Sequence, residues 1–152
     1  MEEVFRSCGG QVWRAVVAMT AGRVDIADDV TAEAFARLLV YQDGVRDPPA
    51  WVFRTAFRLA AAEMRRERQS VSGLTLEFEA HDTAVLSGEL TAALRMLSAE
   101  QRVAVFLHYF ADQPVNEVAR LTGASVTSVK VRLHRARRAL RSSLEAEEVP
   151  HE

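Results

Sequence analysis

The chain lacks several features that define large classes of proteins. Cys8 is its single cysteine, which excludes an internal disulfide, and its four histidines have no metal-ligand spacing. No apolar run approaches the roughly 18 residues that cross a bilayer, and the acidic N-terminus is unlike a signal peptide. Neither a phosphate-binding loop nor a nucleophile–base pattern is present. These absences predict a cytoplasmic, non-enzymatic protein with no cofactor, no metal site and no membrane insertion.

Prolines are also few. Four prolines interrupt the 152 residues, and alternation of apolar and polar residues, as in strands, is scarce. The apolar residues recur instead at helical spacing. We therefore predict an all-α fold, with helices near 3–20, 25–41, 49–69, 83–97, 99–110, 114–121 and 125–144.

Charge is unevenly distributed, although the formal net charge is only −2. Residues 70–90 carry four acidic residues and no basic one, and residues 91–144 carry nine basic residues and three acidic ones. The last eight residues add four glutamates. A basic segment between two acidic ones indicates a negatively charged partner for the C-terminal half.

Residues 70–82 have no helical period and contain serine, glycine and several acids, which is typical of a linker. The sequence therefore predicts two small helical domains. Residues 1–69 are expected to form a three-helix unit, and residues 83–144 a helix-turn-helix unit. Residues 145–152 are expected to form an acidic tail.

The helix-turn-helix prediction rests on the chain between Pro114 and Leu144. A short predicted helix ends before Gly123, which can adopt the left-handed conformation of a tight turn. Ser125 then has the position of a cap for a long basic helix. Two helices joined by a glycine-containing turn are typical of this DNA-binding motif, in which the start of the second helix contacts base edges.

The long helix has two distinct faces. Its apolar residues recur at spacings of three and four and predict a buried stripe that consists of Val129, Leu133, Ala136, Leu140 and Leu144. On the remaining surface, the first residues are expected to contact bases or nearby phosphates, and the later arginines to neutralise phosphates. The predicted DNA-binding residues are Ser125, Thr127, Ser128, Lys130, Val131, Arg132, His134, Arg135 and Arg138.

A family resemblance adds to these expectations. The stretch SVTSVKVRLHRARRAL, residues 125–140, closely resembles region 4 of extracytoplasmic-function (ECF, group 4) sigma factors of the sigma-70 family. A helix-turn-helix alone also resembles LuxR-type regulators. However, residues 25–38 resemble the region 2 helix that docks on RNA polymerase, and residues 51–66 resemble the helix that engages the −10 element. The two regions occur in the order expected of a sigma factor.

The resemblance implies a protein that binds core RNA polymerase and promoter DNA and has an anti-sigma factor as a partner. The implied polymerase-docking residues are Asp25, Asp28, Asp29, Glu33 and Arg37, and region 4 would read the −35 element. The implied −10 residues are Trp51, Arg54, Arg58, Arg65 and Arg66.

The −10 helix departs from the family pattern, because Arg58 and Ala62 stand where members often have Asn and Asp. Two alternatives remain open. One is a stand-alone helix-turn-helix regulator that acts without polymerase. The other is a sigma-like protein that acts mainly through protein partners.

Overall fold

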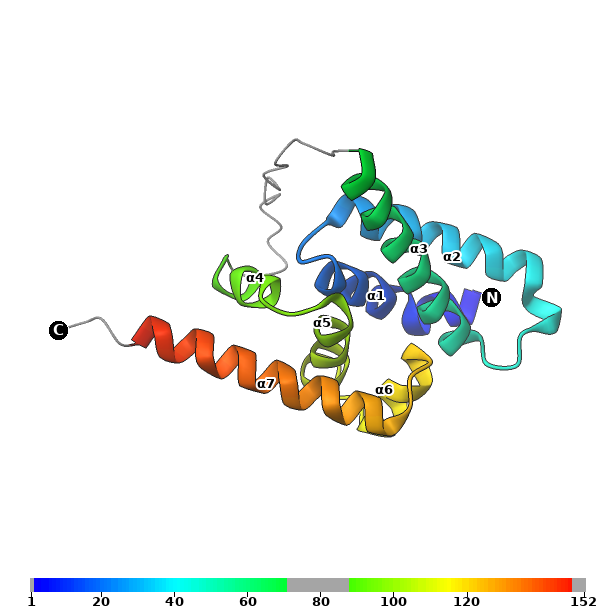
Figure 1. Cartoon of the computed structure of the whole chain (residues 1–152). Coiled ribbons are helices and arrows are strands. Elements are labelled where there is room, and N and C mark those ends of the chain that lie inside the picture. The colour runs from blue at the N-terminus through cyan, green and yellow to red at the C-terminus, as the bar shows by residue number, and fades with distance from the viewer. Residues whose placement is uncertain (1, 71–87, 149–152) are drawn as a thin grey trace.

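The computed structural model describes residues 2–70 and 88–148, and within these ranges it contains helices and turns but no strand (Figure 1). The predicted all-α fold is therefore confirmed. The N-terminal half consists of three long helices that pack against one another, with a short 3-10 turn before the third. These are α1 (Glu2–Met19), α2 (Val24–Tyr41), η1 (Gln42–Gly44) and α3 (Pro48–Ser70).

Helix α3 shows how sequence determines this half. Pro48 and Pro49 occupy its first turn, where backbone N–H groups have no acceptor within the helix, so the missing N–H of proline costs no hydrogen bond. The helix then buries Val52, Phe53 and Ala56 at spacings of one and three, so that one face enters the core. That face packs against both α1 and α2.

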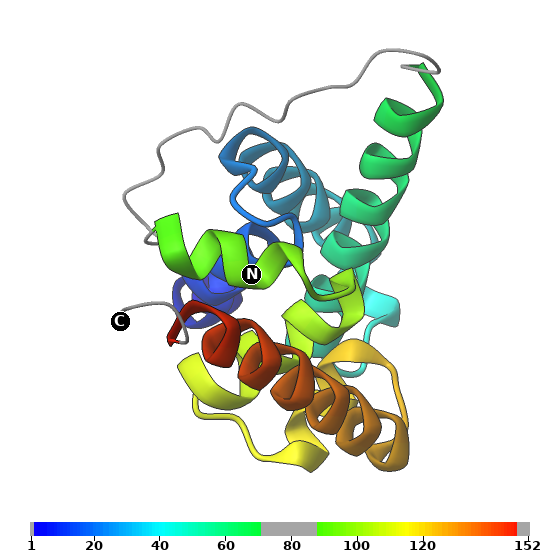
Figure 2. The ribbon, with the colours of Figure 1, turned by 60° about the vertical axis from the view of Figure 1, so that its left-hand side comes forward.

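The C-terminal half is built around α7, which packs against α5 and α6 (Figure 2). Helix α5 begins at a capping box: the Ser98 hydroxyl accepts from the Gln101 amide at 3.2 Å, and the Gln101 side chain accepts from the Ser98 amide at 3.1 Å. The elements are α4 (Gly88–Arg95), α5 (Ala99–Val105), the π-helical turn η2 (Phe106–Phe110), α6 (Val115–Thr122) and α7 (Val126–Glu148).

Some boundaries differ from the sequence prediction. The helix expected at 83–97 is observed over Gly88–Arg95, and residues 83–87 lie outside the described residues, as do 71–82 of the predicted linker and 149–152 of the tail. Helix α7 continues to Glu148 because residues 145–148 are good helix formers and no proline occurs before Pro150. The side chain of Leu144 is also outside the described set.

The two halves pack together in what we call the closed arrangement, with α3 against α6 and α1 against α5. The buried apolar side chains of both halves form one continuous cluster. In Figure 1, α6 lies beside the N-terminal end of α3. None of the helices in the described ranges is both long and apolar enough to cross a membrane.

Candidate nucleic-acid interface

The turn between α6 and α7 has the geometry of a helix-turn-helix. Gly123 adopts the left-handed conformation with φ of 73°, and its N–H donates to the Ala119 carbonyl at 2.9 Å. A side chain at this φ would be strained, so the turn requires glycine. The Ser125 hydroxyl then accepts from the Ser128 amide at 3.0 Å and caps α7.

The face of α7 that is directed away from α5 and α6 is polar and basic. Val129, Leu133 and Ala136 are fully buried and Leu140 is half-buried, so the apolar stripe fixes the helix orientation. The opposite side is open to solvent and contains most of the predicted DNA-binding residues. Those exposed are Ser125, Thr127, Lys130, Val131, His134, Arg135 and Arg138.

Two of the predicted DNA-binding residues are directed toward the protein instead. Ser128 is half-buried, and its hydroxyl is 2.9 Å from that of Ser125. The Arg132 side chain is 26% exposed, and its guanidinium lies 3.7 Å from the Glu100 carboxylate. Val126 was not predicted, yet it is 41% exposed at the first position of α7. Its position at the start of the second helix of the motif was the signal in the sequence that could have identified it. A valine at this position can contact a thymine methyl group.

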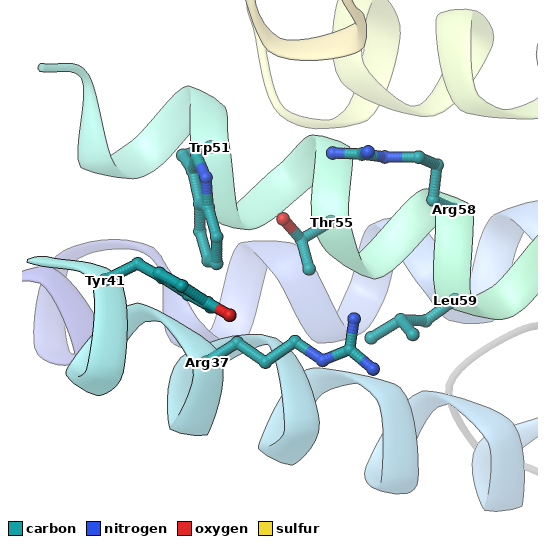
Figure 3. A pocket seen from close by; sticks show the side chains of 6 residues that line it. All are labelled: Arg37, Tyr41, Trp51, Thr55, Arg58 and Leu59. Atoms are coloured by element: carbon teal, nitrogen blue, oxygen red, sulfur yellow. The ribbon is translucent and has the colours of Figure 1, made fainter. Parts of the chain in front are cut away.

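Helices α2 and α3 enclose a hollow of about 410 Å³ beside Trp51 (Figure 3). The Trp51 ring lies next to that of Tyr41, with 6.4 Å between centroids. Arg37 lines the hollow from α2, and Arg58 lines it from α3. The Thr55 hydroxyl also belongs to this wall, is buried, and finds no hydrogen-bond partner among the described residues.

The predicted −10 arginines on α3 differ in their surroundings. Arg54 donates from Nε at 3.1 Å and from Nη2 at 2.5 Å to the carbonyl of Arg120, so its guanidinium is engaged by the helix-turn-helix. Arg65 is exposed, and Arg66 is exposed with Glu63 at 2.8 Å. Arg54 thus contacts the C-terminal half, whereas Arg65 and Arg66 lie nearer the other end of α3.

The predicted docking residues lie along the exposed side of α2. Asp28 accepts a 2.7 Å hydrogen bond from the Trp13 indole, and Glu33 pairs with Arg37 at 2.9 Å. Asp29 is exposed. The structure thus places all of them on one helix, with several held by neighbouring side chains.

Asp25 belongs to a network that also joins α2 to α3. Arg23 donates to Asp25 at 2.7 Å and to both carboxylate oxygens of Glu67 at 2.7 and 2.8 Å. These hydrogen bonds lower the pKa of both carboxyl groups and raise the pKa of Arg23. The network stabilises the junction between α1 and α2.

An apolar surface at the C-terminal end of α2 was not predicted. Leu39, Val40 and Tyr41 are 55%, 76% and 60% exposed, and Ala32 and Ala36 are exposed on the preceding turns. Periodicity alone could not reveal this surface, because α2 is apolar on its buried side as well. Large exposed apolar side chains that are adjacent to one another indicate a contact surface.

No group of three or more His, Cys, Asp or Glu side chains that could hold a metal ion occurs in residues 2–70 and 88–148.

The fold and the exposed basic face of α7 define the class of the protein, which is an all-α protein that carries a helix-turn-helix. The model for sigma-70 region 4 matches residues 87–140.

Curated relatives match both halves of the chain. The ECF RNA polymerase sigma factor EcfG of Rhodopseudomonas palustris is 33% identical, over 86% of this chain and 78% of that protein. The ECF RNA polymerase sigma factor SigL of Mycobacterium tuberculosis is 30% identical, over 95% of this chain and 89% of that protein. The RNA polymerase sigma factor SigV of Bacillus subtilis is 26% identical, over 82% of this chain and 80% of that protein. The chain belongs to the ECF sigma factors of the sigma-70 family, as its sequence predicted.

A solved structure has the same fold over nearly the whole chain. It is the sigma factor RpoE of Bartonella quintana in complex with the anti-sigma factor NepR. The TM-score is 0.74, and the alignment covers 99% of this chain and 98% of that one at 21% identity. This likeness supports the arrangement of the helices across both halves.

Proposed function

We propose that the protein is a sigma factor that binds core RNA polymerase and directs it to promoters through −10 and −35 contacts. The observation that carries this proposal is that the relatives match both halves of the chain, because a stand-alone helix-turn-helix regulator would share only the C-terminal half. In this proposal, residues 1–69 form the region 2 unit and residues 83–144 the region 4 unit.

The exposed face of α7 is the −35 reader. Ser125, Thr127 and Lys130 contact bases or the nearest phosphates, because they lie at the cap and on the first two turns of the second helix of the motif. Val131 offers an apolar contact to a thymine methyl group. The later basic residues bind phosphate and provide affinity without sequence information.

The exposed side of α2 is the polymerase-docking surface. It combines carboxylates, such as Asp29 and Glu33, with the exposed apolar residues Leu39 and Val40. Specific interfaces have an apolar centre and a polar rim, and this surface has both components. On α3, Trp51, Arg54 and Arg58, followed by Arg65 and Arg66, form the −10 surface, which requires the neighbouring α6 to move away from Arg54.

An anti-sigma factor is the proposed inhibitor of this protein. The proposal is supported by the chain's family and by its fold, which it shares with a sigma factor described in complex with such a protein. Co-purification of the tagged chain from its own cells, followed by transcription with and without the captured protein, tests this partner. Captured protein that leaves transcription unchanged would argue against inhibition.

Transcription by reconstituted holoenzyme tests the main proposal. Core polymerase with this chain should initiate at defined start sites on a genomic fragment library, and core alone should not. Val40→Asp should reduce polymerase binding, because it places a charge in the apolar part of the docking surface. Gly10→Asp is the matched control: it adds the same charge on α1, at an exposed glycine whose Cβ would meet open space. Absence of promoter-dependent initiation would refute the sigma-factor proposal.

A further inference from the structure

The end of α6 receives an arginine from the other half of the molecule. Arg54 of α3 donates twice to the carbonyl of Arg120, one turn before the left-handed Gly123. Carbonyls at a helix C-terminus carry partial negative charge, so a guanidinium is favoured there. The approach is close, since a Cβ on Gly123 would lie 3.3 Å from Arg54 Nε.

An ion pair lies beside this hydrogen bond. The Arg120 guanidinium pairs with Asp47, just before α3, and with Glu117 on its own helix. The pair lowers the pKa of the Asp47 carboxyl. Arg120 therefore contacts the N-terminal half through both its side chain and its carbonyl.

The opposite half provides a matching contact. Arg102 of α5 donates to the carbonyl of Met19, the last residue of α1, at 2.7 Å. Each half thus donates an arginine to a helix C-terminus of the other. The closed arrangement therefore contains two contacts of the same kind between the halves.

The interface between these contacts is partly open to solvent. A hollow of about 570 Å³ lies between the halves, lined among others by Met19, Phe57, Ala61, Ala99 and Val103. The buried apolar side chains of the two halves also form one cluster, and the polar contacts add directional interactions to that packing.

The closed arrangement cannot bind both promoter elements at once. Elements named −10 and −35 are centred about 25 base pairs apart, roughly 85 Å of B-form DNA at 3.4 Å per base pair. A compact chain of this length has a radius of gyration of about 15 Å and hence a diameter of about 40 Å. Arg54 of the −10 surface is also 3.1 Å from the carbonyl of Arg120 on α6, the first helix of the helix-turn-helix.

We infer that Asp47, Arg54 and Arg120 form an autoinhibitory latch, which holds the free chain closed and must open when the chain engages polymerase and promoter. This inference rests on the proposed sigma-factor function. The latch is asymmetric: it engages Arg54 of the −10 surface and leaves the reading face of α7 exposed. The free chain should therefore bind duplex DNA through α7 while Arg54 of its −10 surface is engaged by α6.

The latch is tested by measuring the distance between the halves in the full chain. Fluorophores on Gln69→Cys and Ser142→Cys, in a Cys8→Ser background, report opening by energy transfer. Asp47→Asn should shift the equilibrium toward open forms roughly two- to fivefold, as expected for loss of an ion pair, while its amide can still accept from the Ala50 N–H. Arg120→Gln should do the same, and the double variant should add little because both residues act through one contact.

Asp43→Asn is the matched control. It makes the same change four residues earlier in the connection between α2 and α3, at an exposed position of η1. It should leave the distance unchanged. If Asp47→Asn and Arg120→Gln also leave it unchanged, or if their effects simply add, the latch is refuted.

Binding to core polymerase then tests whether the latch inhibits. Asp47→Asn should bind core polymerase about two- to fivefold more tightly, because a larger fraction of the chain is open. An open variant with unchanged polymerase affinity would overturn the inhibitory role. If no form of the chain binds polymerase, the proposed function fails, and the distance measurement still decides whether the latch exists.

Discussion

Arg102 donates a 2.7 Å hydrogen bond to the carbonyl of Met19 across the junction of the two halves. Its guanidinium also donates to the carbonyls of Leu97 at 2.7 Å and Leu94 at 3.3 Å. The arginine is buried, and burial lowers its pKa. No carboxylate hydrogen-bonds to it within the described residues, so carbonyls near the ends of α1 and α4 take the place of a counter-charge.

Replacement of this arginine should therefore destabilise the whole chain. Arg102→Met should lower the free energy of unfolding by about 3 kcal/mol, because the buried carbonyls of Met19 and Leu97 lose their donor and that of Leu94 keeps only the Leu97 amide. Arg102→Lys should retain only part of this stability, since an ammonium group cannot donate in the forked geometry of a guanidinium. Urea unfolding measures both. Arg95→Met, the same change at an exposed site on α4, should alter stability by less than about 0.5 kcal/mol; an equal loss in both variants would contradict the assigned role.

The Arg23–Glu67 pair should make stability depend on pH. Glu67→Gln should lower the free energy of unfolding by about 1 kcal/mol at pH 7, because the partly buried pair is bidentate. The folded state lowers the pKa of Glu67, so this contribution is complete above the ordinary glutamate value of about 4.3 and is lost as the pH falls through the lowered one.

Urea titrations at pH 7 and at acid pH provide the measurement. Wild type and Glu67→Gln should converge in stability at acid pH, where both side chains are neutral. Glu63→Gln, on the same helix and in a more exposed pair with Arg66, should show a smaller difference at pH 7. A constant difference between wild type and Glu67→Gln at every pH would exclude the charge as the cause.

Much of the C-terminal half could be predicted because its signals are local. The Ser98 capping box, the left-handed Gly123 and the buried stripe of Val129, Leu133 and Ala136 each follow from residues a few positions apart. Local hydrogen bonds and helical periodicity determine such features directly. The same reasoning placed α2 and α3 within two residues of their observed ends.

The contacts between the halves could not be predicted in this way. Asp47 and Arg120 are 73 residues apart in the sequence, and no local pattern around either residue indicates that they pair. A contact within the C-terminal half was equally hidden: periodicity placed Arg132 beside the basic face, but its guanidinium lies near Glu100 of α5. Side-chain direction at such positions depends on which neighbouring helix packs there, and that is a property of tertiary structure alone.

Two substitutions of Ser125 should distinguish its role in helix capping from its role in DNA binding. Ser125→Ala should lower stability by about 1 kcal/mol, because the Ser128 amide loses its acceptor. Ser125→Asp should retain the cap and the stability, but it should weaken DNA binding, since its negative charge faces the phosphates. Thermal unfolding and duplex binding of both variants provide the comparison. Equal DNA affinity of Ser125→Asp and wild type would remove Ser125 from the interface.

The salt dependence of duplex binding should sort the residues of α7 by their role. Arg138→Gln should reduce the slope of log K against log salt by about 0.9, which corresponds to one phosphate contact, and it should weaken binding to all sequences alike. Val131→Ala should leave the slope unchanged and reduce discrimination between sequences by about 1 kcal/mol, because it removes an exposed apolar contact. Arg132→Gln is the internal control, since its guanidinium lies 3.7 Å from Glu100 and is mostly covered. If Arg132→Gln changes the slope as much as Arg138→Gln does, Arg132 must leave Glu100 and turn toward DNA when the complex forms.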